Sequence, residues 1–348
     1  MAPPSRLEGF REGRGWGRIP PVLLHGGQAH LSTNRKNMRT LYKYYDYLPK
    51  DYFLNPSMKL TPTSQLNDPF ENIIPQDIFD YINTDAELKA EIERYMNQWG
   101  YDKGDLASHI IDCLNHCGIV SLSETPRNLL MWAHYGAQHK GICIGYKDNL
   151  FDKHLKSNEV EGEDELPYFY RPIKINYDST RLAPNETRIL KYENKTIIYN
   201  ILTHILTTKS DEWIYEKEHR CIVPIYWGDA FITKKAYFKP RDNENGVIKL
   251  TKSEFIHNIS GGMYRLEDGN ENHHKLLSKD RTSILKMISS EAIESLYFGC
   301  KTDITYICDV LNLIEKNPRE LGHIKVFQFK PNPSRFSLDV EECIKLKS

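Results

Sequence analysis

The sequence predicts an α+β fold, with a mixed, mostly antiparallel sheet and helices inserted between its strands. Short runs rich in β-branched and aromatic residues, such as Thr40–Tyr45 and Gly141–Tyr146, are separated by longer stretches of helical periodicity. Most links between the strand-like runs are not simple strand–helix–strand units, which favours antiparallel over parallel pairing. The chain of 348 residues shows no repeat of fixed period, so it suits one large domain with insertions or two domains.

The first 37 residues differ from the rest of the chain. They are rich in Gly, Pro and Arg, have no hydrophobic period, and contain six basic and two acidic side chains. They could form a basic arm for nucleic acid, but we expect a disordered leader or an upstream addition, with Met38 as the natural start. Residues 38–348 are then a single α+β domain with helical insertions. This body is mildly acidic, which argues against broad binding of a phosphate backbone.

Most elements of residues 39–150 follow from local pattern. Apolar residues at helical spacing predict helices across residues 77–116, interrupted at Gly100 and Gly104. The Asn-Asp-Pro sequence at residues 67–69 predicts a turn, because Asn and Asp bond to local backbone and the residue before Pro avoids helix. The other elements expected here are strands at Thr40–Tyr45, Met58–Thr61, Ile119–Ser123 and Gly141–Tyr146, and a short helix at Asn128–Gln138.

The second half of the chain mixes the same two patterns. Residues 152–167 are acidic and loop-like, and residues 240–275 predict a loop with one short strand. The strands expected here are Ile173–Tyr177, Trp213–Tyr226, Ile284–Ile288, Ile293–Phe298 and a final one at Lys325–Lys330. The helices expected are Glu186–Lys209 and Asp303–Lys316, the latter ended by Asn317-Pro318.

The strongest candidate for chemistry lies within Trp213–Tyr226. If this segment is a strand, Glu216, Glu218 and Arg220 share one face, because side chains alternate along a strand. The arginine could hold one carboxylate while the other polarises a hydroxyl or acts as a base. The same pattern also fits a solvated strand face or a buried pair that only stabilises the sheet. We take these three residues as catalytic candidates.

A second candidate combines aromatic and polar residues around residues 123–135. On a helix, Trp132 and Tyr135 could form a shelf that stacks a flat ring, with His134 donating a hydrogen bond. Ser123 precedes them at a strand end, where ligands often bind. The alternative is an aromatic stripe that packs into the core, with a structural histidine.

The turn at residues 67–71 is a third candidate. Asn67, Asp68 and Glu71 could hold a ribose, or the turn could be purely structural with Asp68 capping the backbone. A Mg²⁺-dependent nuclease built from these carboxylates and Glu216 and Glu218 is a weaker option, because no known spacing supports it.

Several function classes are disfavoured by what the sequence does not contain. It has no P-loop, dinucleotide-binding glycine motif, nucleophile elbow or zinc-protease motif. Cys113, His116 and Cys117 have no second pair at zinc-like spacing, so no metal site is expected. Seven scattered cysteines without a signal peptide indicate reduced thiols in the cytoplasm. No apolar run is long enough for a membrane helix.

The combination of segments resembles a bacterial family known as domain of unknown function 2971. The segments that carry this resemblance are Leu41–Tyr44, Asn67–Glu71, Ser121–Glu124, Met131–Tyr135 with Gly141, Trp213 to Arg220, and Ile293–Lys301. It covers roughly residues 39–335. Each piece is weak alone, but the order is specific, and it implies that the three candidate segments meet in one site. It does not name a reaction.

At the level of the fold, the sequence also resembles ADP-ribosyltransferases. In that comparison Lys43, flanked by Tyr42 and Tyr44, stands at the Arg or His of the first motif. Thr61, Thr63 and Ser64 could match the second motif. Glu216-Lys217-Glu218 matches the third, Glu-x-Glu. The resemblance implies NAD as substrate, with Glu218 bonding its ribose and Glu216 orienting or deprotonating the acceptor.

Two functions from different classes follow. The first is an NAD-dependent ADP-ribosyltransferase or NAD glycohydrolase that acts on a protein or nucleic acid, in phage defence or as a toxin. Its catalytic candidates are Glu216, Glu218 and Arg220. Its NAD-binding candidates are Tyr42, Lys43, Tyr44, Ser64, Asn67, Asp68, Ser123, Trp132, His134 and Tyr135. The second is a non-catalytic sensor or adaptor that binds a nucleotide or peptide. The sequence predicts no membrane partner and leaves the oligomeric state open.

Overall fold

The computed structural model describes residues 38–84, 86–98, 106–152, 166–181, 196–233, 255–258, 263–266 and 282–343. The expected leader at residues 1–37 and most of the loop expected at residues 240–275 lie outside the described residues.

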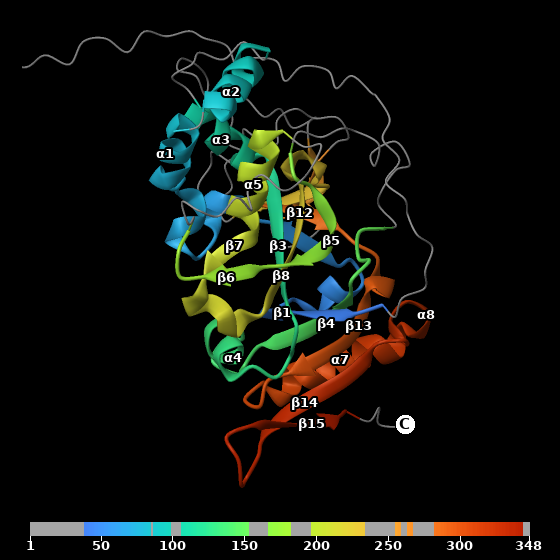
Figure 1. Ribbon diagram of the computed structural model, residues 1–348. Coiled ribbons are helices and arrows are strands. Elements are labelled where there is room, and N and C mark those ends of the chain that lie inside the picture. Colours follow the sequence, from blue (N-terminus) through green and yellow to red (C-terminus); the bar gives the residue numbers. More distant parts are fainter. Residues whose placement is uncertain are drawn as a thin grey trace, which may run out of the picture.

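A large sheet forms the centre of the described chain (Figure 1). Its strand order is β15-β14-β13-β4-β1-β3-β8-β5. All neighbouring pairs are antiparallel except β13 and β14. The fold is therefore α+β with a mixed, mostly antiparallel sheet, as predicted. The strands are β1 (Thr40–Tyr45), β3 (Cys117–Ser123), β4 (Ile142–Lys147), β5 (Phe169–Lys174), β8 (Glu218–Pro224), β13 (Ile293–Phe298), β14 (Lys325–Pro331) and β15 (Leu338–Glu342).

Two smaller sheets flank the large one. The first has the order β10-β11-β9-β12-β2, and a bridge between Thr61 and Ile119 links its β2 edge to β3. The second is the parallel pair β6-β7. Their strands are β2 (Ser57–Leu60), β6 (Asn176–Asp178), β7 (Thr208–Ser210), β9 (Ala230–Thr233), β10 (Phe255–Asn258), β11 (Met263–Leu266) and β12 (Thr282–Met287).

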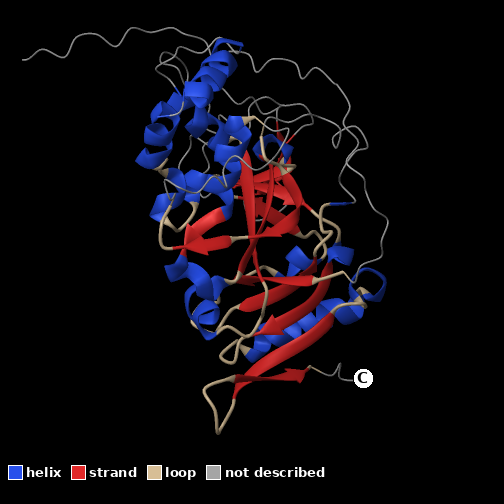
Figure 2. Cartoon of the chain, viewed as in Figure 1, coloured by secondary structure: helices blue, strands red, loops and turns tan. Residues whose placement is uncertain are grey.

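Most helices gather at one end of the molecule (Figure 2). There α1 (Gln76–Thr84), α2 (Ala86–Gln98), α3 (Leu106–Asn115) and α5 (Ile197–Thr207) share one apolar cluster. The remaining α-helices of the described chain are α4 (Leu129–Tyr135), α7 (Ile304–Lys316) and α8 (Pro318–Leu321). Its 3₁₀ helices are η1 (Lys50–Phe53), η2 (Thr63–Gln65), η3 (Pro69–Asn72), η6 (Asp211–Glu216), η7 (Ile225–Trp227) and η9 (Ser290–Ala292).

The two faces of the large sheet pack differently. On one face, β-strand residues such as Ile144 and Leu296 pack with the apolar side of α7, including Val310. On the other face, a smaller cluster surrounds Trp132 of α4 and includes Tyr44 and Phe329. Helix α4 covers only part of this second face, which leaves room for a cavity beside it.

Five predicted elements need correction. The expected strand Ile173–Tyr177 is divided between β5 and β6, and residues 240–275 contain two short strands, β10 and β11, instead of one. The segment Trp213–Tyr226 is not one strand, because residues Asp211–Glu216 form η6 and only Glu218–Pro224 form β8. Between them, Lys217 adopts a left-handed conformation with φ of 46°. Part of the expected helix Glu186–Lys209 lies outside the described residues. Its described part forms α5, and Lys209 belongs to β7 instead. Strand β14 is not the last strand, because β15 pairs with it after a turn.

The turn between α4 and β4 holds the helix in place by an unusual backbone. Ala137, Gln138 and His139 all have positive φ, between 47° and 71°. Lys140 follows, and at Gly141 a Cβ atom would collide with the carbonyl oxygen of Tyr45 in β1. The glycine therefore permits the close approach that fixes α4 beside β1.

Replacement of Gly141 by alanine is expected to lower the free energy of unfolding by about 1–3 kcal/mol, the usual cost of an overpacked site. Urea denaturation of Gly141→Ala beside the parent protein measures this difference. An unchanged midpoint and slope would contradict the close packing described for this turn.

Candidate functional site

A cavity of about 230 Å³ lies on the side of the large sheet next to α4. It takes residues from nine separate elements and from the turn after η2, so distant parts of the chain meet there. The lining residues are Tyr42, Lys43, Tyr44, Lys59, Thr61, Gln65, Leu66, Asn67, Glu71, Ser121, Leu122, Ser123, Met131, Tyr135, Lys209, Glu216, Glu218 and Arg220.

Strand register brings the first part of the site together. In the β3–β8 ladder, Ser123 lies opposite Glu218 and Ser121 lies opposite Arg220. Opposite residues of antiparallel strands point to the same face, so these side chains share one face of the sheet. The expectation that Glu218 and Arg220 share a face is confirmed.

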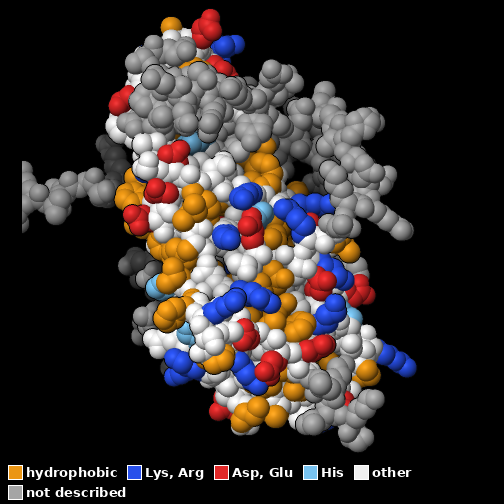
Figure 3. Space-filling view, turned by 60° about the horizontal axis from the view of Figure 1, so that its bottom comes forward, with side chains coloured by type: hydrophobic (Ala, Val, Ile, Leu, Met, Phe, Trp, Pro, Cys, Tyr) orange, Lys and Arg blue, Asp and Glu red, His pale blue; other side chains and the backbone are white. Residues whose placement is uncertain are grey.

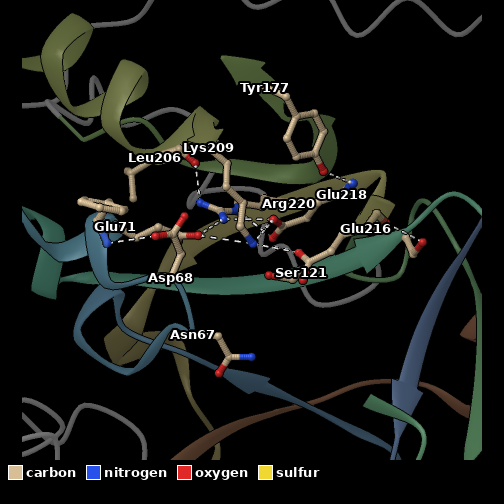
Figure 4. Close-up of polar contacts among 12 residues, drawn as sticks. Asn67, Asp68, Glu71, Ser121, Tyr177, Leu206, Lys209, Glu216, Glu218 and Arg220 are labelled. Atoms are coloured by element: carbon tan, nitrogen blue, oxygen red, sulfur yellow. Dashed lines mark hydrogen bonds and ion pairs between the residues drawn. The ribbon is translucent and has the colours of Figure 1, made fainter. Parts of the chain in front are cut away.

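Arg220 is the centre of a buried ionic network on the cavity floor (Figure 4). Its side chain is 1% exposed, and its Nε and Nη2 donate to the two carboxylate oxygens of Glu218 at 2.8 and 3.0 Å. Nη2 also donates to Oε1 of Glu71 at 2.7 Å, and Nη1 donates to the carbonyl oxygen of Leu206 at 3.0 Å. The guanidinium thus ties β8 to η3 and α5.

Lys209 is the second cation of this network. Its Nζ lies 2.8 Å from Oε2 of Glu216, 3.2 Å from Oε2 of Glu218 and 3.5 Å from Oε1 of Glu71. It also lies 4.7 Å from the centre of the Trp213 ring, in a cation–π contact. Lysine can approach three carboxylates at once because its ammonium group is compact and has three donors.

Glu216 reaches the same network although it is not on the strand. Its Oε1 accepts a hydrogen bond from the hydroxyl of Tyr135 at 2.6 Å, while Oε2 faces Lys209. Asn67 in turn donates to the Tyr135 hydroxyl at 3.3 Å. Ser123 fixes η6 by donating to the Glu216 carbonyl at 2.7 Å. Three predicted segments therefore converge, through Asn67, Tyr135 and Glu216.

We define the carboxylate floor as Glu71, Glu216 and Glu218 together with Lys209 and Arg220. Burial alone would raise the pKa of Glu218, but Arg220 and Lys209 outweigh it and lower the pKa to about 2. For Glu71 burial dominates, and its pKa is raised above the usual range. Two residues of the floor that share the same cations therefore differ strongly in proton affinity.

Two further lysines line the cavity, Lys43 and Lys59, which we call the lysine wall. Strands β1 and β3 pair only at Tyr42 and Ser123, and beside this pair the Nζ of Lys43 donates to the carbonyl oxygen of Ser121 at 2.9 Å. Burial lowers the pKa of Lys43 to about 8 and also lowers the pKa of Lys59. Among the described residues, neither lysine forms an ion pair with a carboxylate.

Nine of the thirteen site residues predicted from the sequence line this cavity. They are Tyr42, Lys43, Tyr44, Asn67, Ser123, Tyr135, Glu216, Glu218 and Arg220.

Four predicted residues lie elsewhere. Trp132 is fully buried in the core, with its Nε1 donating to the carbonyl oxygen of Pro126 at 2.8 Å, so its ring cannot stack a ligand. His134 is exposed, with its ring near that of Tyr215, and it is not among the lining residues. Asp68 is buried as the N-cap of η3, where it accepts from the Phe70 amide. Ser64 is exposed on η2 and is not among the lining residues.

Three of the charged lining residues are not among the thirteen predicted site residues. Glu71 was considered with Asn67 and Asp68 as a residue that could hold a ribose, but it was not included in the predicted site. Lys59 alternates with buried residues on a strand, which is a weak sign that it faces a different environment. Lys209 gave no local signal, because a lysine at the end of a helical pattern is usually solvated.

Three further findings concern metal binding, membrane-spanning helices and surface charge. Within the described part of the chain, no group of three or more His, Cys, Asp or Glu side chains is arranged to hold a metal ion. Within the same residues, no helix has the length and apolarity needed to cross a bilayer. The space-filling view shows Lys and Arg side chains beside Asp and Glu side chains, with no broad area of one sign on the face displayed (Figure 3).

Comparison with known proteins gives one match. No curated protein and no solved structure matches the chain. Residues 131–221, from α4 to β8, match a family described as "Protein of unknown function (DUF2971)". This segment carries Tyr135, Lys209, Glu216, Glu218 and Arg220, and so includes most of the carboxylate floor. The part of the chain that builds the floor is thus similar to a protein family whose function has not been assigned.

Proposed function

We propose that the protein is an enzyme that binds NAD in this cavity and acts at the carbon that joins its ribose to nicotinamide. The ADP-ribosyl group would pass to a protein, a nucleic acid or water. The observation that carries the proposal is the set of charged groups in one cavity. The floor holds three carboxylates in place with two cations, and the wall adds two lysines that form no ion pair with a carboxylate among the described residues.

The carboxylate floor suits the charge that develops in this reaction. When the bond to nicotinamide breaks, positive charge builds on the ribose carbon, and fixed negative charge nearby lowers the barrier. Glu218 supplies such charge at every physiological pH, because its pKa is about 2. Arg220 and Lys209 hold the carboxylate in place before the substrate binds, so little reorganisation is needed.

The lysine wall suits the phosphates of the same substrate. Lys43 and Lys59 are half-buried and form no ion pair with a carboxylate among the described residues, although burial lowers the pKa of Lys43 and Glu218 and Glu216 oppose this lowering from a distance. A phosphate oxygen would therefore be a direct anionic partner for each amine. A bound anion favours the protonated form of each amine, which offsets the effect of burial. Tyr42 and Tyr44 flank Lys43 and also line the cavity, and the hydroxyl of Tyr44 donates to the carbonyl oxygen of Thr125 at 2.7 Å.

The size of the cavity suits part of a dinucleotide. At about 230 Å³ it is smaller than the roughly 300–1,000 Å³ typical of pockets that enclose a whole ligand. It would therefore take the nicotinamide and its ribose, with the remainder of NAD extending past the lysine wall.

The test is the incubation of the purified protein with NAD labelled on the adenine side, with a cell lysate as acceptor. We expect Glu218→Gln to lower turnover by about 100-fold or more, because it removes the negative charge that stabilises the transition state.

Lys43→Met is expected to weaken NAD binding by about 10-fold, because one charge-assisted contact is lost. Lys330→Met is the matched control, because Lys330 forms an exposed ion pair with Glu341. It should change neither NAD turnover nor NAD binding. Equal turnover by the parent and Glu218→Gln would exclude this mechanism.

A second candidate is a nucleotide-binding sensor without catalysis. One observation favours it: both oxygens of Glu218 are already engaged, by Arg220 and Lys209, as in a structural scaffold. In that case nucleotides would raise the unfolding temperature without being consumed. Release of nicotinamide by the parent protein would rule the sensor out.

A further inference from the structure

We propose that Glu71 accepts the proton of the hydroxyl group that attacks the ribose carbon. This inference rests on the proposed function and assigns the base of that reaction to a residue of η3. The resemblance to ADP-ribosyltransferases would instead give this role to Glu216.

The position of Glu71 is fixed by the local sequence. Asp68 caps η3 by accepting from the Phe70 amide at 2.9 Å, and Pro69 begins the helix with the backbone angle that it requires. This turn directs Glu71 inward, where it is 5% exposed and lines the cavity.

The two oxygens of Glu71 differ in their contacts. Oε1 accepts from Arg220 and faces Lys209, whereas Oε2 is buried and has no hydrogen-bond partner among the described residues. A buried carboxylate oxygen without a donor is costly, by about 1–3 kcal/mol, so a ligand hydroxyl that supplies the donor is favoured there.

The other two glutamates of the floor lack such a free oxygen. Glu216 uses Oε1 for Tyr135 and Oε2 for Lys209, and Glu218 uses both oxygens for Arg220. Within the described residues, Glu71 is the member of the carboxylate floor with an oxygen that accepts no hydrogen bond.

The electrostatic surroundings of Glu71 also suit a base. Burial raises its pKa, Glu218 raises it further, and Arg220 and Lys209 oppose the rise. A carboxyl group with a raised pKa accepts a proton more readily than an ordinary glutamate. Glu218 stays ionised under the same conditions, so the two residues are suited to different tasks.

The reaction balances without a further reactant. The bond between the ribose carbon and the nicotinamide nitrogen breaks, and its electron pair leaves with nicotinamide. The hydroxyl oxygen of water or of the acceptor forms the new bond to carbon, and its proton passes to Oε2 of Glu71. No electron is gained or lost overall.

The test compares the pH dependence of NAD turnover between about pH 5 and about pH 9. The parent rate should fall on the acid side as Glu71 takes up a proton. Glu71→Gln should reduce NAD turnover by about 100-fold or more. Its remaining rate should not fall at low pH, because the amide of glutamine does not titrate there. Glu341→Gln, an exposed carboxylate on β15, is the control and should keep the parent profile.

A second variant separates catalysis from structure. Glu71→Ala opens space for a small carboxylate, and added formate should restore part of its turnover if Glu71 is a base. The inference would be overturned if formate restored no turnover, or if the rate of Glu71→Gln fell at low pH as the parent rate does. If Glu71→Gln does not fold, the parent protein still tests the inference. A parent turnover that does not fall at low pH would overturn it equally. A parent protein that consumes no NAD would instead remove the proposed function, and this step with it.

Discussion

Replacement of Arg220 by methionine is expected to lower the free energy of unfolding by about 3–5 kcal/mol. The guanidinium is 1% exposed and donates to Glu218, to Glu71 and to the Leu206 carbonyl. Without it, two buried carboxylates keep only Lys209 as a cation, and the cost of desolvating them is no longer offset. Urea denaturation at neutral pH measures the loss.

Arg171 offers the matched control for this variant. It forms a bidentate contact with Asp152, but its side chain is 63% exposed. Exposed ion pairs contribute about 1 kcal/mol or less, so Arg171→Met should have a small effect. Similar losses in both variants would contradict the view that burial, rather than pairing alone, determines the contribution of Arg220.

The stability of the protein should also depend on pH through Glu218. Its pKa is about 2 in the folded protein, against about 4.3 for a glutamate in the unfolded chain. As pH falls, the unfolded chain takes up this proton first. The stabilisation is therefore complete above about pH 4.3 and is lost as pH falls towards 2, by roughly 3 kcal/mol in all.

Comparison with Glu218→Gln isolates this contribution from other groups that titrate in the same range. The gap in unfolding free energy between the parent and the variant should shrink by roughly 3 kcal/mol between about pH 5 and about pH 2. A gap that stays constant across the range would show that Glu218 is not held by Arg220 and Lys209 as described.

The fold class could be predicted because it depends on patterns that are local in sequence. Thr40–Tyr45 and Ile293–Phe298 are rich in β-formers, and both are strands at the expected positions. Their arrangement could not be predicted in the same way. Strand β1 lies between β4 and β3, and β13 pairs with β4 from about 150 residues away, which no local pattern records.

The Glu-x-Glu segment shows how a correct grouping can rest on a wrong local structure. Glu216 and Glu218 do meet, but one lies on η6 and the other on β8. Lys217 in the left-handed conformation ends η6 and separates it from β8. A lysine carries no sign of a positive φ, so the sequence alone suggests a continuous strand.

Helix α4 illustrates the opposite case. The helix itself was predicted correctly, but the prediction of which residues face the cavity was partly wrong. The helix forms as expected, but Trp132 faces the core and Tyr135 faces the cavity. Periodicity places residues on faces of a helix without saying which face meets a core and which a cavity. Lys209 could not be recognised for a related reason, since its three carboxylate partners come from η3, η6 and β8.

The contact between Arg220 and Glu71 joins residues that are 149 positions apart. During synthesis Glu71 is therefore made long before its cation. At about 5–20 residues per second, the delay before Arg220 follows is roughly 7–30 s. Until then the nascent chain presents the glutamate to water, and the cavity cannot close around it. A ligand that depends on the carboxylate floor can consequently bind only after the chain has been extended through β8.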